Sequence, residues 1–273
     1  MNFCIIGLKW GKNYIKNLEF LEQNIAAICS RNSSDVDSQF LEYKHIKDYR
    51  KIALNEIDVA CICTPPSSHF EMCKYFLTNK KHVIVEKPFV FLPDQADELK
   101  TLAVKHKVSL LISYQYLWNK DYLAVLGAFK GKVANRTIEN NSIGNVSREE
   151  YSFLWDYSSH DLAMVYHIIG DKTPLKIKFL EETKEGYSYM LEGNNWVVKN
   201  TFRFDAGPKV RNMIISCDAK VSRFEDNYSD NAILTMLSEF IDAVSNGVTF
   251  TNIDVAISVT NILAELSNYK EKS

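Results

Sequence analysis

The sequence predicts an α/β protein with an N-terminal doubly wound parallel sheet and a C-terminal α+β domain with an open, mostly antiparallel sheet. Three observations predict it. Short apolar runs alternate with helix-periodic stretches in the first part of the chain, and these runs lack any alternation of apolar and polar residues. Strand-like segments without helices between them follow from about residue 176. We therefore expect one domain over residues 1–118 and a second over residues 119–273.

The apolar runs of the first domain are short, as strands buried on both faces of a parallel sheet are. Between them, apolar residues recur at helical spacing, for example at Ile15, Leu18 and Leu21. Strands and helices in this order form parallel strands joined by right-handed crossovers. The expected strands are Asn2–Ile6, Ile25–Cys29, Asp58–Cys63, His82–Val85 and Val108–Ile112.

The second domain is expected to begin with a helix that Asn119 caps and Gly131 closes. A second helix is expected from His160 to Ile169, ending at Gly170. Polar and apolar residues then alternate in Trp196–Phe204, which predicts a strand with one wetter face. The expected strands are Lys176–Glu182, Tyr187–Glu192, Trp196–Phe204, Arg211–Cys217 and Lys220–Glu225, and two helices follow them.

Composition and charge narrow the class of protein. With 46% hydrophobic and 24% charged residues the chain has the composition of a globular protein. A net charge of -2 lacks the basic surplus of a nucleic-acid or anionic-membrane binder. No apolar run approaches the roughly 20 residues that span a bilayer. The apolar start, Met1–Ile6, leads into a glycine turn, so we expect a buried strand there and not a signal peptide.

We expect a cytoplasmic protein that forms a homo-oligomer. An open sheet rich in aromatic residues commonly buries its free face against a second copy, which points to residues 176–225. The cysteines are interpreted as small buried side chains in a reducing compartment. Cys61 and Cys63 share one face of a strand, but two further zinc ligands are not evident. The six cysteines are Cys4, Cys29, Cys61, Cys63, Cys73 and Cys217.

The first strand leads into a glycine turn followed by an amphipathic helix. The dinucleotide-binding turn of a Rossmann domain stands at this place, with the pyrophosphate on the helix N-terminus. The full fingerprint is G-x-G-x-x-G, whereas the glycines here are Gly7 and Gly11, one residue short and without a middle glycine. A simple strand-to-helix turn is therefore the alternative interpretation.

The end of the second strand bears on the choice of cofactor. Domains that select NAD usually carry Asp or Glu there for the ribose 2′-hydroxyl, but this chain has Ser30, Arg31 and Asn32. A guanidinium fork suits a 2′-phosphate. We therefore expect NADP(H) in preference to NAD(H). An arginine that is merely solvated in a loop is the other interpretation.

Three segments, taken in order and spacing, resemble a known family. They are Thr64-Pro65-Pro66-Ser67-Ser68-His69, Val83-Ile84-Val85-Glu86-Lys87-Pro88-Phe89 and Trp155-Asp156-Tyr157-Ser158-Ser159-His160-Asp161. Together they resemble the Gfo/Idh/MocA oxidoreductases, which include glucose–fructose oxidoreductase and inositol dehydrogenase. The resemblance extends over nearly the whole chain, which is short for the family. It implies an NAD(P)-dependent dehydrogenase or reductase that transfers a hydride to or from a carbinol or carbonyl carbon of a sugar, nucleotide sugar or polyol.

The resemblance also implies roles for particular residues. Lys87 matches the lysine that hydrogen-bonds both the cofactor and the reacting hydroxyl. Asp156 and His160 match a D-x-x-x-H pair whose histidine exchanges a proton with the substrate oxygen. Pro88 is expected after a cis peptide bond that aims Lys87 at the nicotinamide. The implied cofactor-binding residues are Gly7, Lys9, Trp10, Gly11, Ser30, Arg31, Thr64, Pro65, His69, Glu86 and Lys87, and no metal is expected.

The chemistry of these side chains agrees with the implied roles. A histidine titrates near neutrality and can accept or return a proton as a hydride leaves or arrives. Residues four apart lie on one face of a helix, so Asp156 can orient His160. A nearby lysine stabilises alkoxide character. Taken singly, each residue has a structural explanation, and Asp156 could simply cap a helix that begins near Ser158.

Some features leave alternatives open. Ser158 and Ser159 stand where the family often has small Gly and Pro residues. Three aromatic residues, Tyr114, Tyr116 and Trp118, could stack on a pyranose ring or belong to the core. The missing glycine favours a second hypothesis, a catalytically inactive dinucleotide-binding regulator or accessory subunit. A third is a C=N (imine) reductase, in which the same lysine and histidine would protonate nitrogen.

Overall fold

The computed structural model describes residues 1–32, 36–127, 136–144, 151–170, 173–217, 220–226 and 231–269. The chain forms two compact units. The first unit contains Met1–Ser113 and Ile233–Ala256, and the second contains Tyr114–Ala232 and Ile257–Ser273. The break at Tyr114 lies a few residues before the expected boundary after residue 118. The segment Ile233–Ala256, expected in the second domain, lies in the first unit.

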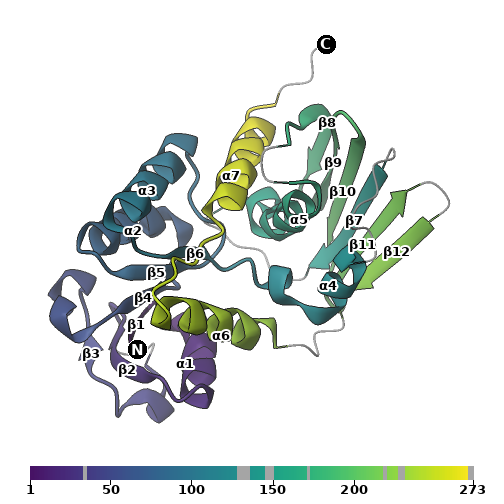
Figure 1. Ribbon diagram of the computed structural model, residues 1–273. Coiled ribbons are helices and arrows are strands. Elements are labelled where there is room, and N and C mark those ends of the chain that lie inside the picture. Colours follow the sequence, from purple (N-terminus) through teal and green to yellow (C-terminus); the bar gives the residue numbers. More distant parts are fainter. Residues whose placement is uncertain are drawn as a thin grey trace. The chain divides into compact units, whose positions relative to one another are not determined.

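The first unit contains the expected parallel sheet, now with six strands. They are β1 (Asn2–Ile6), β2 (Asn24–Cys29), β3 (His45–Ile46), β4 (Val59–Ile62), β5 (His82–Val85) and β6 (Leu110–Ile112). Their order is β3-β2-β1-β4-β5-β6, so the direction of winding reverses between β1 and β4 (Figure 1). The short strand β3 was not predicted, because two residues carry no periodicity. Every residue of β4 is buried, as the apolar runs indicated.

Helices cover both faces of this sheet. They are α1 (Leu8–Phe20), α2 (His69–Thr78), α3 (Pro93–His106) and α6 (Ala232–Ser245). Right-handed crossovers change face where the winding reverses, and α2 and α3 lie together on the face opposite α1 (Figure 1). An ion pair of 2.8 Å between Lys74 and Glu98 joins α2 to α3. Each helix buries one apolar face, which in α1 includes Ile15 and Leu18.

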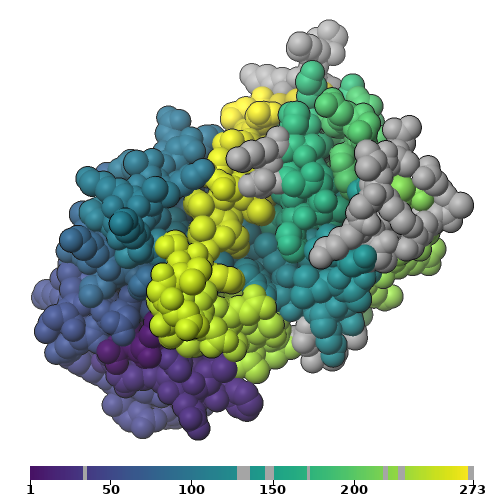
Figure 2. All heavy atoms as spheres, in the orientation of Figure 1, coloured from purple at the N-terminus to yellow at the C-terminus, as the bar shows by residue number. Residues whose placement is uncertain are grey.

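A segment from late in the chain completes the first unit. Phe240 of α6 packs edge-on against His82 of β5, with ring centroids 6.4 Å apart. Helix α6 is the first of the two helices predicted after the last strand, but its place in the sequence does not indicate which domain it covers. In the space-filling view the side chains of this segment, in yellow-green, lie at the molecular surface (Figure 2). The first unit is therefore discontinuous in sequence.

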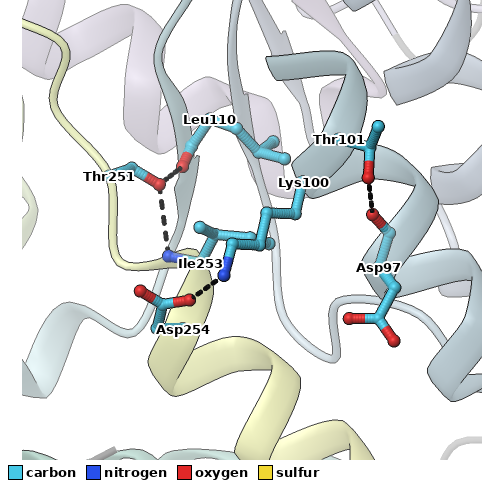
Figure 3. Close-up of polar contacts among 7 residues, drawn as sticks. All are labelled: Asp97, Lys100, Thr101, Leu110, Thr251, Ile253 and Asp254. Atoms are coloured by element: carbon cyan, nitrogen blue, oxygen red, sulfur yellow. Dashed lines mark hydrogen bonds and ion pairs between the residues drawn. The ribbon is translucent and has the colours of Figure 1, made fainter. Parts of the chain in front are cut away.

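Residues 250–252 of this segment run alongside the edge strand β6. The Thr251 hydroxyl donates to the Leu110 carbonyl at 2.6 Å. The Asn252 side chain donates to the Ile112 carbonyl at 2.8 Å and accepts its N–H at 2.9 Å. Beside these bonds lies an ion pair of 2.5 Å between Lys100 and Asp254 (Figure 3). Side chains thus satisfy the backbone groups of an edge strand that would otherwise be open to pairing.

The second unit contains the expected open sheet. Its strands are β7 (Arg136–Gly144), β8 (Lys176–Thr183), β9 (Gly186–Glu192), β10 (Trp196–Phe204), β11 (Val210–Cys217) and β12 (Lys220–Glu225). The order is β12-β11-β7-β10-β9-β8, and only the β7–β10 pairing is parallel. Strand β7 was not predicted although it is central. Its buried positions include Asn140 and Ser142, so its sequence lacks the usual apolar alternation.

The helices of the second unit are α4 (Lys120–Gly127), α5 (Phe153–Ile169) and α7 (Ile253–Ser267), the last of which contributes to both units. Asn119 caps α4 as predicted, because its side-chain oxygen accepts the N–H groups of Asp121 and Tyr122 at 2.9 and 3.1 Å. The predicted end of this helix at Gly131 lies outside the described residues.

Helix α5 begins at Phe153, earlier than the predicted His160. Its first turns are aromatic and pack on the sheet, where the rings of Tyr157 and Phe202 stack with centroids 4.1 Å apart. The helix ends at Gly170, as expected. It is buried nearly all round, which made its start hard to find from the spacing of apolar residues.

All six cysteines are buried and carry free thiols. Burial raises the pKa of the Cys4 and Cys63 thiols. Within the described ranges, no group of three or more His, Cys, Asp or Glu residues could hold a metal ion. In the same part of the chain, no helix is both long enough and apolar enough to cross a membrane.

Candidate active site

The glycine turn lies where the winding of the parallel sheet reverses. Gly7 follows β1 and has a φ of 89°, which favours glycine. A Cβ at Gly7 would also lie only 2.7 Å from the backbone of Cys63, just after β4. A Cβ at Gly11 would lie 2.7 Å from Ile5 of β1. The two glycines therefore serve the tight turn and the close packing of helix on strand, two of the three purposes of the full fingerprint.

Glu86 joins the glycine turn to the end of β5. Its Oε1 atom accepts hydrogen bonds from the Trp10 indole at 2.9 Å and from the Tyr14 hydroxyl at 2.7 Å. Both donors belong to α1, so the carboxylate fixes the start of this helix against the E-K-P segment. Desolvation raises the pKa of Glu86 above its ordinary value, although Tyr14 and Lys87 act in the opposite direction.

Lys87 directly follows this anchor. The peptide bond between Lys87 and Pro88 is cis, as predicted. Lys87 itself is half-buried. Because its neighbour Glu86 is held by α1, the segment that carries the lysine is fixed next to the glycine turn.

His69 ties the T-P-P segment to the E-K-P segment. It is fully buried. Its Nε2 atom lies 2.8 Å from the Thr64 carbonyl oxygen, and its Nδ1 atom lies 3.0 Å from the carbonyl oxygens of both Pro88 and Phe89. Desolvation lowers the pKa of this imidazole. The contacts of His69 are thus with protein backbone, which holds the two segments together.

The T-P-P segment presents two further predicted residues beside this histidine. The Thr64 hydroxyl lies 2.7 Å from that of Ser68, which bonds to the Pro65 carbonyl at 2.7 Å. Thr64 is half-buried and Pro65 is exposed. A contact of either residue with a cofactor stays a prediction.

The end of β2 differs in character from the glycine turn. Ser30 is buried, and its hydroxyl bonds to the Asn32 carbonyl at 3.2 Å. The Nε2 atom of His45, a residue of β3, lies 3.0 Å from the Ser30 carbonyl oxygen. This contact holds the backbone at Ser30. Arg31 is exposed. The backbone at Ser30 is therefore held by these contacts, and the next residue carries a guanidinium that solvent can reach.

The residues of the glycine turn fit a dinucleotide phosphate. The first turn of α1 contains no acidic residue that would repel an anion. Its first N–H groups have no partner within the helix, as at every helix N-terminus. Lys9 and Trp10 are exposed at this end of the helix. Although the middle glycine is absent, the donors that a pyrophosphate requires are thus in place.

Asp156 and His160 lie on α5 in the second unit. Both are buried, each with 7% of its surface exposed. They are four residues apart within one continuous helix, so they share a face. Asp156 stands inside the helix, after its N-cap Ser152. This position rules out the alternative that Asp156 is simply the cap.

The three aromatic residues after β6 differ in their surroundings. Tyr114 and Tyr116 are buried, with ring centroids 6.4 and 4.9 Å from that of His160. Trp118 is partly exposed. Burial raises the pKa of the Tyr114 hydroxyl, which has no hydrogen-bond partner among the described residues. Two of the three aromatic residues therefore surround the predicted proton-exchanging histidine.

Sequence reasoning missed a buried ion pair beside this histidine. Arg211 of β11 donates to Asp161 of α5, and the two are 5% and 0% exposed. A signal was present, because Arg211 occupies an inward position in a strand whose other inward residues are apolar. Asp161 likewise stands directly before the buried apolar run Leu162–Val165 of α5. Charged residues are almost never fully buried unless they are paired.

The structure thus assembles two groups of predicted residues. The first unit contains the glycine turn, the T-P-P and E-K-P segments and the exposed Arg31. The second unit contains Asp156 and His160. A doubly wound sheet with a glycine turn at its switch point defines a dinucleotide-binding protein of the Rossmann class.

Comparison with known sequences shows which family the first part of the chain is similar to. Residues 1–114 match the family model described as the Gfo/Idh/MocA oxidoreductase family, NAD-binding Rossmann fold. This match confirms the resemblance over residues 1–114.

Two curated relatives and one solved structure show how far the similarity extends. The chain is 28% identical to the uncharacterized oxidoreductase YrbE of Bacillus subtilis over 59% of this chain and 51% of the relative. It is 22% identical to the scyllo-inositol 2-dehydrogenase (NADP(+)) IolW of the same organism, over 55% and 45%. The chain thus spans about half the length of these relatives. The WlbA (WbpB) dehydrogenase from Thermus thermophilus, in complex with NAD and UDP-GlcNAcA, is 15% identical with a TM-score of 0.80 over 99% and 95% of the two chains.

Proposed function

We propose that this chain is a dehydrogenase or reductase that exchanges a hydride with a carbinol or carbonyl carbon of a sugar, nucleotide sugar or polyol, with NADP(H) as the preferred cofactor. The observation that carries the proposal is the pair Asp156 and His160, buried four residues apart on one helix. Such a pair suits proton exchange at an alcohol oxygen. It stands in a chain whose first 114 residues match the model of an NAD-binding oxidoreductase family.

Each proposed residue has a chemical task. A bound nicotinamide supplies the hydride chemistry. His160 takes the proton of a substrate hydroxyl in oxidation and returns it in reduction, and Asp156 holds the imidazole in one orientation. The Lys87 ammonium stabilises the negative charge that develops on the same oxygen. Gly7, Gly11 and the first turn of α1 bind the pyrophosphate.

The preference for NADP(H) depends on the loop after β2. Arg31 is exposed there, and the loop carries no carboxylate at positions 30 to 32 that would hold a ribose 2′-hydroxyl. A guanidinium can bind a 2′-phosphate through two parallel hydrogen bonds. The name of the relative IolW includes NADP(+), which supports this preference.

We also propose self-association through the outer face of the second unit's sheet. Val221 of β12 is a large apolar residue on this face, opposite in direction to the buried Phe224, and has 54% of its surface exposed. Exposed apolar residues on an open sheet favour burial against a second copy. Free, buried cysteines support a reducing compartment such as the cytoplasm.

A titration of the purified protein with NADPH and NADH tests the cofactor proposal first. We expect tighter binding of NADPH, and loss of that preference in Arg31→Ala by roughly tenfold or more, because a charge-assisted bond to phosphate is lost. Arg203→Ala, which removes an exposed arginine of the second unit, is the matched control and should bind both cofactors as the wild type does. Tighter binding of NADH would contradict the Arg31 argument and leave the oxidoreductase proposal standing.

Turnover then separates the oxidoreductase from the two alternatives. Sugars, nucleotide sugars and polyols are screened with the preferred cofactor, and we expect His160→Asn to abolish turnover while cofactor binding is retained. Cofactor binding without turnover of any alcohol, carbonyl or imine substrate would favour the regulatory subunit. Turnover of imines alone would favour the C=N reductase. Binding of neither cofactor would contradict the proposal as a whole.

A further inference from the structure

A continuous set of contacts runs from His160 to the buried ion pair of the second unit. The rings of His160 and Tyr116 are nearly perpendicular, at 88°, with centroids 4.9 Å apart. The guanidinium carbon of Arg211 lies 4.7 Å from the centroid of the Tyr116 ring. The same guanidinium forms an ion pair with Asp161, the residue that follows His160 in α5.

Three elements contribute to this set, so it is not a product of local sequence. Tyr116 lies in the short 3₁₀ helix η6 (Gln115–Trp118), His160 and Asp161 lie on α5, and Arg211 lies on β11. All four side chains are buried, with at most 8% of their surface exposed. The set therefore starts and ends on the same turn of α5.

We propose that Tyr116 and Arg211 are positioning residues for His160, with Asp161 fixing Arg211, Arg211 fixing the Tyr116 ring, and the ring fixing the imidazole. The inference rests on the proposed function, because it assigns a proton-exchange role to His160. An arginine suits this task since its planar guanidinium can stack on an aromatic ring and bond to a carboxylate at once.

The energetics of buried charges favour a positioning task over simple stabilisation. A buried ion pair must overcome a large desolvation penalty, so apolar residues of similar volume often give equal or greater stability. What apolar residues cannot provide is a directed contact that fixes a ring. Perpendicular aromatic pairs likewise have a preferred geometry, because the edge and the face of a ring differ in charge. Tyr116 has such a contact on His160 and a cation near its ring.

The charged groups near His160 determine how the protonation of its imidazole should respond to substitutions. Asp156 and Asp161 are on its own helix, Arg211 faces the cluster from β11, and Tyr114 and Tyr116 face it from the segment before α4. With both present, the charges of Asp161 and Arg211 offset each other. Removal of either partner leaves one charge of known sign near the imidazole.

The kinetic test compares changes that keep or remove the ring. Tyr116→Phe keeps the ring and should retain kcat within about twofold, because the proposed contacts involve the ring and not the hydroxyl. Tyr116→Leu should lower kcat by roughly 10- to 100-fold with little change in KM, since displacement of a catalytic group has effects of this size. Arg211→Lys keeps the charge but loses the planar group and should also lower kcat. A Tyr116→Leu variant with the kcat of the wild type would overturn the proposal.

The second test does not depend on turnover. Nuclear magnetic resonance of the protein with ¹⁵N-labelled histidine follows the ring nitrogens of His160 against pH, with His160→Asn to identify its signals. We expect Arg211→Met to raise the pKa of His160, because the Asp161 carboxylate is then uncompensated, and Asp161→Asn to lower it. The double variant should return close to the wild type. A shared structural disruption would not produce shifts of opposite sign.

These readouts keep the inference and the proposed function apart. Absence of cofactor binding or turnover in the wild type would contradict the proposed function, while the opposite pKa shifts would still establish the link between the ion pair and His160. Equal or same-direction shifts in Arg211→Met and Asp161→Asn would overturn the inference even in an active enzyme. Circular dichroism and urea unfolding verify that each variant is folded.

Discussion

At the scale of single residues, Glu86 illustrates how one carboxylate fixes a shortened phosphate turn. A full glycine fingerprint sets the path of the chain through three glycines, whereas this turn has two. One oxygen of Glu86 accepts bonds from Trp10 and Tyr14, which hold the first turns of α1. These bonds come from the side chains of the helix itself, so they leave its first backbone N–H groups for a ligand.

The stability of the protein should depend on pH through Glu86. Desolvation raises the folded-state pKa of this carboxyl above 4.5, so the folded state favours its protonated form. The stability that this preference contributes is present below the ordinary pKa and is lost as pH rises through the folded-state pKa. In Glu86→Gln the amide oxygen can still accept from Trp10 and Tyr14, but nothing titrates. The variant should therefore gain stability relative to the wild type as pH rises above 4.5, the ordinary pKa of this group.

Urea unfolding of both proteins across this pH range measures the difference in free energy of unfolding. Glu42→Gln is the control, since Glu42 is exposed and its removal should leave the pH dependence of the wild type unchanged. A Glu86→Gln variant whose stability follows the wild-type curve in parallel would show that Glu86 titrates at its ordinary pKa in the folded protein.

At the scale of elements, the edge strand β6 shows how side chains close a parallel sheet. Among the residues that the structure describes, no seventh strand pairs with β6. Thr251 and Asn252 instead bond to its backbone from the segment that leads into α7. The Asn252 amide has a donor and an acceptor in one plane, so it bonds to both backbone groups of Ile112 much as a neighbouring strand would.

Asn252→Ala should therefore destabilise the first unit by about 2 to 4 kcal/mol, because it leaves a partly buried N–H and C=O of Ile112 without partners. Urea unfolding measures the loss, and hydrogen exchange should show faster exchange at the Ile112 amide. Asn268→Ala is the matched control, since its side chain makes one exposed bond of 2.8 Å to the Ala264 carbonyl. Equal effects of the two substitutions would show that the bonds to β6 contribute no more than a surface bond does.

At the scale of the whole molecule, the sequence predicted both sheets because each has a period that a short segment reveals. Strands such as β4 are apolar throughout, and strands such as β10 alternate. Two strands were not predicted, each for a different reason. Strand β3 is too short to show a period, and β7 places Asn140 and Ser142 at inward positions. Local pattern also gives no information on which unit a late helix joins, as with α6.

The candidate site was predictable where family motifs cover it and unpredictable where distant segments meet. Glu86, Lys87, Asp156 and His160 lie within the segments that resemble the family. The bond from Trp10 to Glu86 joins residues 76 apart in sequence, and the pair of Arg211 with Asp161 joins residues 50 apart. Such partners are set by topology, which a single sequence does not show.

The discontinuity of the first unit leads to a prediction about fragments. The sequence predicts a whole domain over residues 1–118. This fragment lacks Phe240, which packs on His82, and it lacks the bonds of Thr251 and Asn252 to β6. It should unfold at lower urea concentration than residues 1–113 joined through a flexible Gly/Ser linker to residues 233–256, because the linked form restores the apolar helix and closes the sheet edge. The linked form should also bind NADPH, since it contains the glycine turn and Arg31. If the two fragments unfold at the same urea concentration, the late segment does not stabilise the first unit, and a contiguous domain over residues 1–118 becomes the better description.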